Sequence, residues 1–153
     1  MNKYLKLFFI LFVSSLSLGF TSCDDDDDPD YAKEIAGTYK GTISALESEI
    51  PNAEIKIARK SENRVTISMN QDLGVAVVDV TAESDVLFSD KTYSVAGTAT
   101  YEWTEGAEVT LPVEIKGTID KDYNATINIV LGKGIELEGF PFPITAKFEG
   151  KKQ

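Results

Sequence analysis

The sequence predicts an all-β fold, an antiparallel eight-stranded up-and-down barrel, with a two-sheet sandwich as the alternative. Three observations predict this fold. After residue 30, apolar and polar residues alternate with a period of two rather than 3.6. Residues that favour turns separate the alternating runs at short intervals. No stretch favours a helix longer than two turns. A closed barrel is preferred because closure leaves no unpaired strand edge.

Five of the expected strands alternate cleanly, so each should turn an apolar face inward and a polar face to water. In residues 64–70, for example, Val65, Ile67 and Met69 alternate with polar side chains. The five runs are residues 53–59, 64–70, 109–119, 123–131 and 142–148.

Three further strands are less regular. Residues 37–45 open the domain. Residues 75–80 are apolar apart from Asp79, which predicts a strand that is buried on both faces or bulged. Residues 91–103 are rich in Thr, Ala and Tyr, with Gly97 as a kink or a point of close packing.

Two local features complete the expected sheet. Residues 83–90 can hold one helical turn, and residues 86–88 can instead extend a neighbouring strand. Pro112 lies inside an otherwise regular strand and has no N–H for the ladder, so we expect a bulge or a seam there.

Composition excludes several kinds of chemistry. The 153 residues include no His and one Cys, and 15 basic residues against 25 acidic ones give a net charge of −10. Without His there is no Ser-His-Asp or Cys-His catalysis and no His-ligated zinc. A single Cys excludes an intramolecular disulfide, a Cys₄ zinc site and a cysteine-held iron–sulfur cluster. The acidic balance argues against nucleic acid as a partner, and no cofactor or metal is expected.

Residues 1–22 have the layout of a secretory signal peptide. Lys3 and Lys6 precede an apolar run over residues 7–20, and small residues follow. The run is shorter than the roughly 20 apolar residues that span a bilayer.

The signal peptide ends at a cysteine. Phe-Thr-Ser-Cys at residues 20–23 resembles a bacterial lipobox, although Phe20 replaces the usual Leu. The resemblance implies that Cys23 is lipidated, with acyl chains such as palmitate, and becomes the first residue of the mature protein. The expected partner is therefore a membrane, reached through an N-terminal lipid anchor.

Residues 23–34 are expected to form an acidic, disordered tether, because adjacent like charges repel one another. The acidic run resembles the export signal of Bacteroidetes lipoproteins, which implies an outer-membrane, cell-surface location, with a periplasm-facing one as the alternative. Asp24 alone also resembles an inner-membrane retention signal, and the carboxylates could bind calcium weakly. The run consists of Asp24, Asp25, Asp26, Asp27 and Asp28.

Three segments resemble the calycin-like lipoprotein domain of Bacteroidetes. They are Ile-Ala-Gly-Thr-Tyr-Lys-Gly-Thr at residues 35–42, Asn-Arg-Val-Thr-Ile-Ser at 63–68 and Ile-Thr-Ala-Lys-Phe-Glu-Gly at 144–150. The resemblance spans residues 35–150. It implies a lipocalin-like eight-stranded barrel on the cell surface or in the periplasm, with no catalytic residues.

Paired carboxylates could hydrolyse glycosides without histidine. The candidates lie in polar strand positions or in turns, where no apolar pocket would raise the pKa of an acid. We therefore expect no enzyme. The six candidates are Glu102, Glu105, Glu108, Glu114, Glu136 and Glu138.

Binding is the leading functional expectation. The inward faces are apolar, so a cavity would hold a small apolar or amphipathic ligand. Tyr101, Trp103, Phe140 and Phe142 could line its mouth, or could pack only the core and rim. The alternative is a protein-interaction, envelope accessory or inhibitor module with a filled barrel, in which residues 138–143 (Glu-Gly-Phe-Pro-Phe-Pro) dock a partner.

Overall fold

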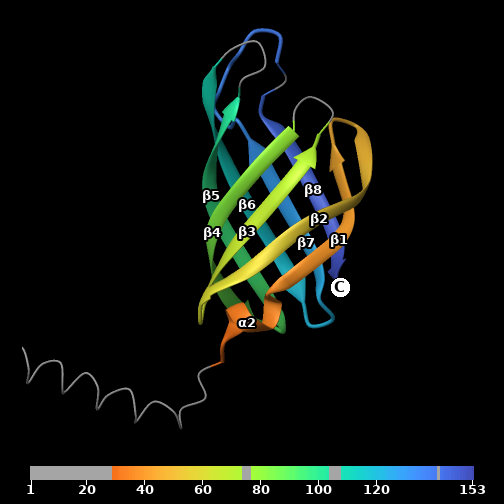
Figure 1. Ribbon diagram of the computed structural model, residues 1–153, viewed down its shortest axis with the longest axis vertical. Coiled ribbons are helices and arrows are strands. Elements are labelled where there is room, and N and C mark those ends of the chain that lie inside the picture. The colour runs from red at the N-terminus through yellow and green to blue at the C-terminus, as the bar shows by residue number, and fades with distance from the viewer. Residues whose placement is uncertain (1–28, 74–76, 104–107, 141) are drawn as a thin grey trace, which may run out of the picture.

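The computed structural model describes residues 29–73, 77–103, 108–140 and 142–153. Eight antiparallel strands form a closed barrel in which each strand pairs with its neighbours along the chain (Figure 1). The predicted up-and-down barrel is confirmed, and the sandwich is not the fold. The strands are β1 Gly37–Ala45, β2 Ser48–Ser61, β3 Arg64–Asp72, β4 Val77–Ser89, β5 Thr92–Trp103, β6 Val109–Asp120, β7 Asn124–Leu131 and β8 Ile144–Lys152.

The first and last strands close the barrel. The pairing of β1 with β8 runs from Tyr39 opposite Lys152 to Ala45 opposite Ala146. Gly41 lies within this seam, and a Cβ at Gly41 would stand 1.9 Å from the carbonyl oxygen of Glu149. Only glycine therefore allows the two backbones to approach this closely.

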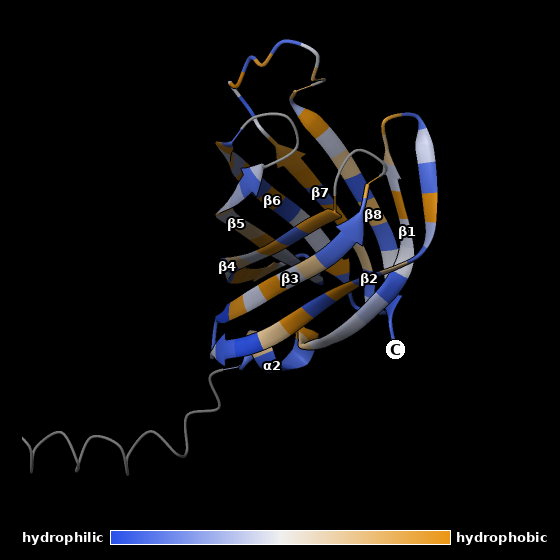
Figure 2. Ribbon diagram, turned by 45° about the horizontal axis from the view of Figure 1, so that its top comes forward, coloured by the Kyte–Doolittle hydropathy of each residue, from blue (hydrophilic) through white to orange (hydrophobic). Residues whose placement is uncertain are grey.

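The alternating apolar and polar residues of the strands form the inner and outer faces of the barrel wall. Ile55 and Ile57 of β2 and Ile67 of β3 point inward and are buried, whereas the residues between them face outward. Figure 2 shows hydrophobic and hydrophilic residues alternating along these strands. The buried side chains form one continuous hydrophobic cluster, with Trp103 and Phe148 among the largest.

Strand β4 is longer and more regular than predicted. A helical turn at residues 83–90 is wrong, because the strand continues to Ser89. Asp79 faces solvent and causes no bulge in the pairing with β3. The inward series includes Ser84, whose hydroxyl donates to the carbonyl of Asp85 (2.8 Å) and accepts from the N–H of Ala96 (2.7 Å). A buried polar side chain is tolerated here because both of its bonds are made.

Pro112 marks the end of a ladder and produces no bulge. The β5–β6 pairing runs without a break past Thr100 opposite Pro112. The β6–β7 ladder ends at Val113 opposite Leu131, one residue short of Pro112. Beyond the ladder, the N–H of Gly132 donates to the Pro112 carbonyl (2.8 Å). The Gly132 carbonyl accepts instead from the N–H of Ile135 (3.0 Å). Proline has no N–H to offer the Gly132 carbonyl, and the N–H of Ile135 in the following loop takes its place.

A five-residue helix, α2 (Tyr31–Ile35), covers one end of the barrel. Asp30 caps it by accepting from the Lys33 N–H (2.9 Å), and the Arg59 Nε lies 2.7 Å from the other Asp30 carboxylate oxygen. Partial desolvation acts to raise the pKa of Asp30, but these bonds hold it below its usual range. The sequence assigned residues 31–34 to the tether, whereas the packed region begins at this cap.

The helix closes the barrel end because its apolar residues enter the core. Ala32 and Ile35 are fully buried. The hydroxyl of Tyr39, which is also buried, donates to the Ile35 carbonyl (2.8 Å), and burial raises the pKa of this phenol. From the last strand, the Lys152 ammonium donates to the Glu34 carbonyl (2.9 Å).

Gly41→Ala should lower the free energy of unfolding by about 3 kcal/mol, since the new Cβ meets backbone that cannot move aside. Urea denaturation measures the loss. Gly139→Ala is the control: its φ of +85° costs about 1 kcal/mol, but nothing lies within 4 Å of the added Cβ. Equal losses in the two variants would contradict the close approach at the seam.

Candidate functional site

Four aromatic residues meet at the barrel end opposite α2, and we call them the aromatic mouth: Tyr101, Trp103, Phe140 and Phe142. Trp103 is the centre, and the rings of Phe140 and Phe142 meet it edge-on at 5.3 and 5.2 Å between centroids. The two phenylalanine rings stack at 6.1 Å. Tyr101 lies 6.4 Å from Trp103. The structure thus brings together all four residues that the sequence selected.

Local geometry explains why these rings converge. Tyr101 and Trp103 are two residues apart near the end of β5, so both point inward. The Tyr101 hydroxyl donates to the Val77 carbonyl (2.8 Å), which ties the mouth to β4. After β7, Gly132 adopts a φ of +76°, and a Cβ there would lie 2.8 Å from the Phe142 ring. The absence of a side chain at Gly132 therefore makes room for Phe142.

The four rings differ in exposure. Trp103 is only 1% exposed, so core packing accounts for its position. Tyr101, Phe140 and Phe142 are half-buried and pack against the core. The part of the aromatic mouth that a ligand could touch is therefore formed by these three residues.

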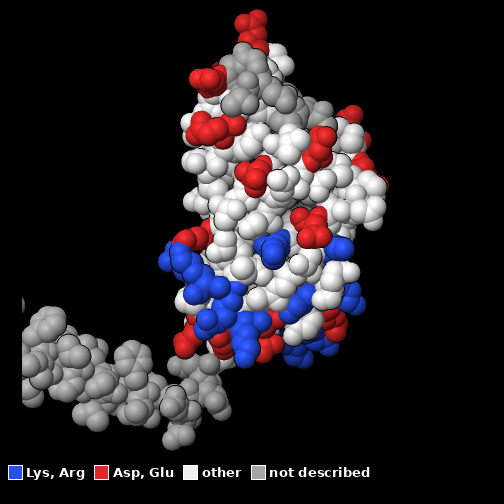
Figure 3. Space-filling view, viewed as in Figure 1, with Lys and Arg blue, Asp and Glu red and all other residues white. Residues whose placement is uncertain are grey.

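Carboxylates are concentrated at the same end of the barrel as the aromatic mouth. Figure 3 shows acidic side chains over the upper part of the barrel, with Lys and Arg concentrated towards the α2 end. Lys133 is a described base in the loop after β7, and its ammonium lies 3.2 Å from Glu114. The negative potential of these carboxylates favours a neutral or positively charged ligand over an anion. The described acidic residues at this end include Glu47, Glu49, Asp72, Glu102, Glu108, Glu136 and Glu138.

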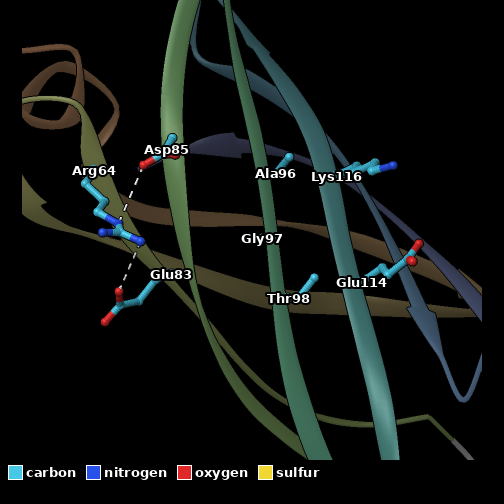
Figure 4. A pocket seen from close by; sticks show the side chains of 8 residues that line it. All are labelled: Arg64, Glu83, Asp85, Ala96, Gly97, Thr98, Glu114 and Lys116. Atoms are coloured by element: carbon cyan, nitrogen blue, oxygen red, sulfur yellow. Dashed lines mark ion pairs between the residues drawn. The ribbon is translucent and has the colours of Figure 1, made fainter.

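Several hollows lie on the outer wall of the barrel. One of them, of about 390 Å³, lies over β5, where small side chains stand between long charged ones (Figure 4). Arg64 spans one flank, 3.6 Å from both Glu83 and Asp85. Its charge is thus already paired within the wall, and we read this hollow as a solvated furrow. The lining residues are Arg64, Glu83, Asp85, Ala96, Gly97, Thr98, Glu114 and Lys116.

Two of the candidate catalytic acids have structural partners. Both carboxylate oxygens of Glu102 accept from the Thr110 hydroxyl (2.8 and 2.9 Å), and Glu114 pairs with Lys133. Glu105 lies outside the described residues. None of the other five is buried. Within the described part of the chain, no three His, Cys, Asp or Glu side chains gather as metal ligands.

The N-terminal predictions concern residues that the structure does not describe. These are the signal peptide at residues 1–22, the lipidation site Cys23 and the export signal at residues 24–28. Among the residues it does describe, no helix has the length and apolar character needed to cross a bilayer.

A second aromatic cluster, at the α2 end, was missed from the sequence. Phe88 and Tyr93 are opposite each other on β4 and β5, with ring centroids 4.7 Å apart. Tyr31 of α2 lies 5.3 Å from Phe88 and 6.1 Å from Tyr93. The available signal was the position of Phe88 and Tyr93 on either side of a turn, which the expected helical turn obscured.

No protein-family model and no curated protein sequence matches the chain. A similar solved structure is the crystal structure, at 2.40 Å resolution, of a putative outer membrane protein from Bacteroides fragilis. It is 19% identical, with a TM-score of 0.52, and the match covers 80% of this chain. The match covers 53% of the other protein, so this chain spans about half of its length. At this identity the likeness shows a shared barrel fold.

Gly132→Ala should loosen the aromatic mouth, because the new Cβ displaces the Phe142 ring from Trp103. Trp103 is the single tryptophan of the chain, so its emission reports on the mouth alone. We expect a red shift and faster acrylamide quenching, with a loss of about 1–3 kcal/mol in unfolding free energy. The control Gly134→Ala shares the positive φ (+79°) but meets nothing within 4 Å. An identical red shift in both variants would refute the packing role of Gly132.

Proposed function

We propose that this chain is a lipoprotein of the bacterial envelope whose noncatalytic barrel binds a small molecule at the aromatic mouth. The observation that carries the proposal is the convergence of four aromatic residues at one barrel end, three of them half-buried rather than buried. Aromatic rings at a half-wet surface give a large apolar contact area at low entropic cost.

The surroundings of the mouth define the ligand class. The rings favour an apolar or amphipathic molecule, and the carboxylates around them favour a neutral or positively charged polar end. The inward side chains below the mouth belong to one buried cluster. The ligand would therefore rest across the mouth, with its apolar part on Tyr101, Phe140 and Phe142.

Location follows from the N-terminal segment. The lipobox at residues 20–23 supports anchoring at Cys23, and the run at residues 24–28 supports export to the outer membrane facing the cell surface. A periplasm-facing position is the alternative. The likeness of fold to a putative outer membrane protein from Bacteroides fragilis is consistent with an outer-membrane location.

One observation favours a second candidate, a protein-interaction, accessory or inhibitor module. An eight-stranded barrel either is filled by side chains or holds one small ligand, and the described inward side chains here form a single buried cluster. In that case, Phe140 and Phe142 would be contacts for a partner protein.

Native mass spectrometry of the protein purified from its host membranes tests the small-molecule proposal. We expect a co-purifying mass whose affinity falls roughly 30-fold in Phe140→Ala, because a central interface aromatic contributes about 2 kcal/mol. Phe88→Ala, at the other end of the barrel, is the matched control and should retain the mass. Absence of any small molecule, with a protein retained only when Phe140 is present, would instead support the interaction module.

Cys23→Ala tests the anchor. Loss of the acyl chains should move the protein from the detergent phase to the aqueous phase in Triton X-114 partitioning, since two or more chains are needed for stable anchoring. Cell-surface exposure further predicts that protease added to intact cells degrades the lipidated protein. Unchanged partitioning of the variant would show that Cys23 is not the anchor.

A further inference from the structure

Two large hydrophobic side chains are exposed next to each other at the α2 end. Leu87 is 69% exposed and Phe88 is 41% exposed, and both lie at the end of β4 before the turn into β5. Successive residues point to opposite faces of a strand, so Leu87 continues the outward series of β4 and Phe88 continues its inward series beyond the buried core. Both side chains are nevertheless open to solvent at the hairpin tip. Exposed apolar side chains gathered at one barrel end are typical of a contact surface.

Two tyrosines, Tyr31 and Tyr93, lie beside Phe88 at this barrel end. We call Leu87, Phe88, Tyr31 and Tyr93 the apolar foot, because the three rings contact one another at 4.7 to 6.1 Å. Burial, with smaller effects from Glu34, Tyr123 and Tyr31, raises the pKa of Tyr93. Tyrosine rings beside an apolar tip are typical of the interface between lipid and water.

Long basic side chains surround the foot. Lys33 in α2, Lys91 in the β4–β5 turn and Lys121 in the β6–β7 turn are all exposed. Such side chains can lie along an apolar surface and extend their ammonium groups to headgroups. Acidic residues such as Asp90 and Asp122 lie in the same turns. We therefore expect an apolar contact with a bilayer rather than an attraction that requires anionic lipid.

Chain length places this end next to the proposed anchor. Cys23 lies seven residues before Asp30, so a fully extended chain spans at most about 25 Å between them. Asp30 is fixed at the start of α2 by its bonds to Lys33 and Arg59. The 12 residues of β5 are about 40 Å long, and with the roughly 35–45° tilt of barrel strands they rise about 30 Å along the barrel axis towards the mouth. A lipid on Cys23 therefore holds the α2 end, and not the mouth, close to the membrane.

On the basis of the proposed anchoring at Cys23, we propose that the apolar foot inserts into the interfacial layer of the bilayer. Leu87 and Phe88 enter the layer between headgroups and acyl chains, and Tyr31 and Tyr93 lie at its level. This contact holds the barrel upright on the membrane, with the aromatic mouth directed away from it. The acyl chains supply affinity, and the foot supplies orientation.

Quenching by brominated lipid tests this contact in the full protein purified from its host membranes. Phe88→Trp and Val77→Trp are reconstituted into vesicles of phosphatidylcholine with or without bromine on the acyl chains. Val77 is the matched control, since it is 55% exposed and begins the same strand at the opposite end. The native Trp103, buried at the mouth, is common to both variants.

We expect the emission added by Phe88→Trp to fall roughly twofold in brominated vesicles, as for a residue in the interfacial layer. The emission added by Val77→Trp should stay unchanged. Equal emission of Phe88→Trp in both lipids, or equal quenching of the two variants, overturns the proposal. Concentration-dependent dimerisation without quenching also overturns it, because a second copy would then cover the foot.

Flotation of the same vesicles separates failure of the foot from failure of the anchor. If the protein floats and Phe88→Trp is not quenched, the anchor stands and the foot does not contact lipid. If Cys23→Ala floats as well as the unmodified protein, Cys23 is not the anchor, and quenching at position 88 still decides whether the foot binds lipid. If neither floats and position 88 is unquenched, both proposals are rejected.

Discussion

The closed fold of this protein depends on the pairing of β1 with β8. The seam removes the two edges that an open eight-stranded sheet would leave, and it turns eight amphipathic strands into one enclosed core. Its geometry is demanding, since Gly41 and Gly150 lie opposite each other and the Phe148 ring covers Gly150. Lys152, at the end of the same seam, bonds the Glu34 carbonyl and lies 4.7 Å from the Tyr123 ring centroid. Closure, the core and the end helix are therefore parts of one arrangement.

How far the sequence predicts this fold depends on the kind of feature. A period of two determines which residues face inward, because side chains alternate along any strand. It does not determine where a strand ends, since the length of the partner strand decides that. Strand β4 shows the limit: Ser84 interrupts the apolar series, and only its bonds to Asp85 and Ala96 make its burial acceptable. Helix α2 was missed because five residues carry too little periodicity, and Ala32 and Ile35 are buried only against a finished barrel end.

The two candidate sites also differ in how far they could be predicted from the sequence. The aromatic mouth could be predicted because Tyr101 and Trp103 share a face near a strand end and the two phenylalanines follow in a proline-flanked loop. The burial of Trp103 beneath its neighbours could not be predicted. The packing of Phe142 against Trp103 depends on the space that Gly132 leaves for the Phe142 ring. The apolar foot joins Tyr31 to Phe88 and Tyr93 across the barrel end, and no local pattern connects residues so distant in the chain. The two ends of the barrel therefore differ in chemistry: carboxylates are concentrated at the mouth, and exposed apolar side chains lie at the α2 end.

The closing seam also governs the order of events when the molecule is made. The two partners in this seam stand at opposite ends of the barrel's sequence, so a chain emerging from its N-terminus can form hairpins early but cannot finish the cylinder. Until β8 arrives, β1 and β7 each keep a bare edge that attracts other strands, and the apolar interior stays open to water. Contacts between such distant segments form slowly. Resistance to proteases should therefore appear in one late step, and until then the open edges and apolar interior are exposed to aggregation.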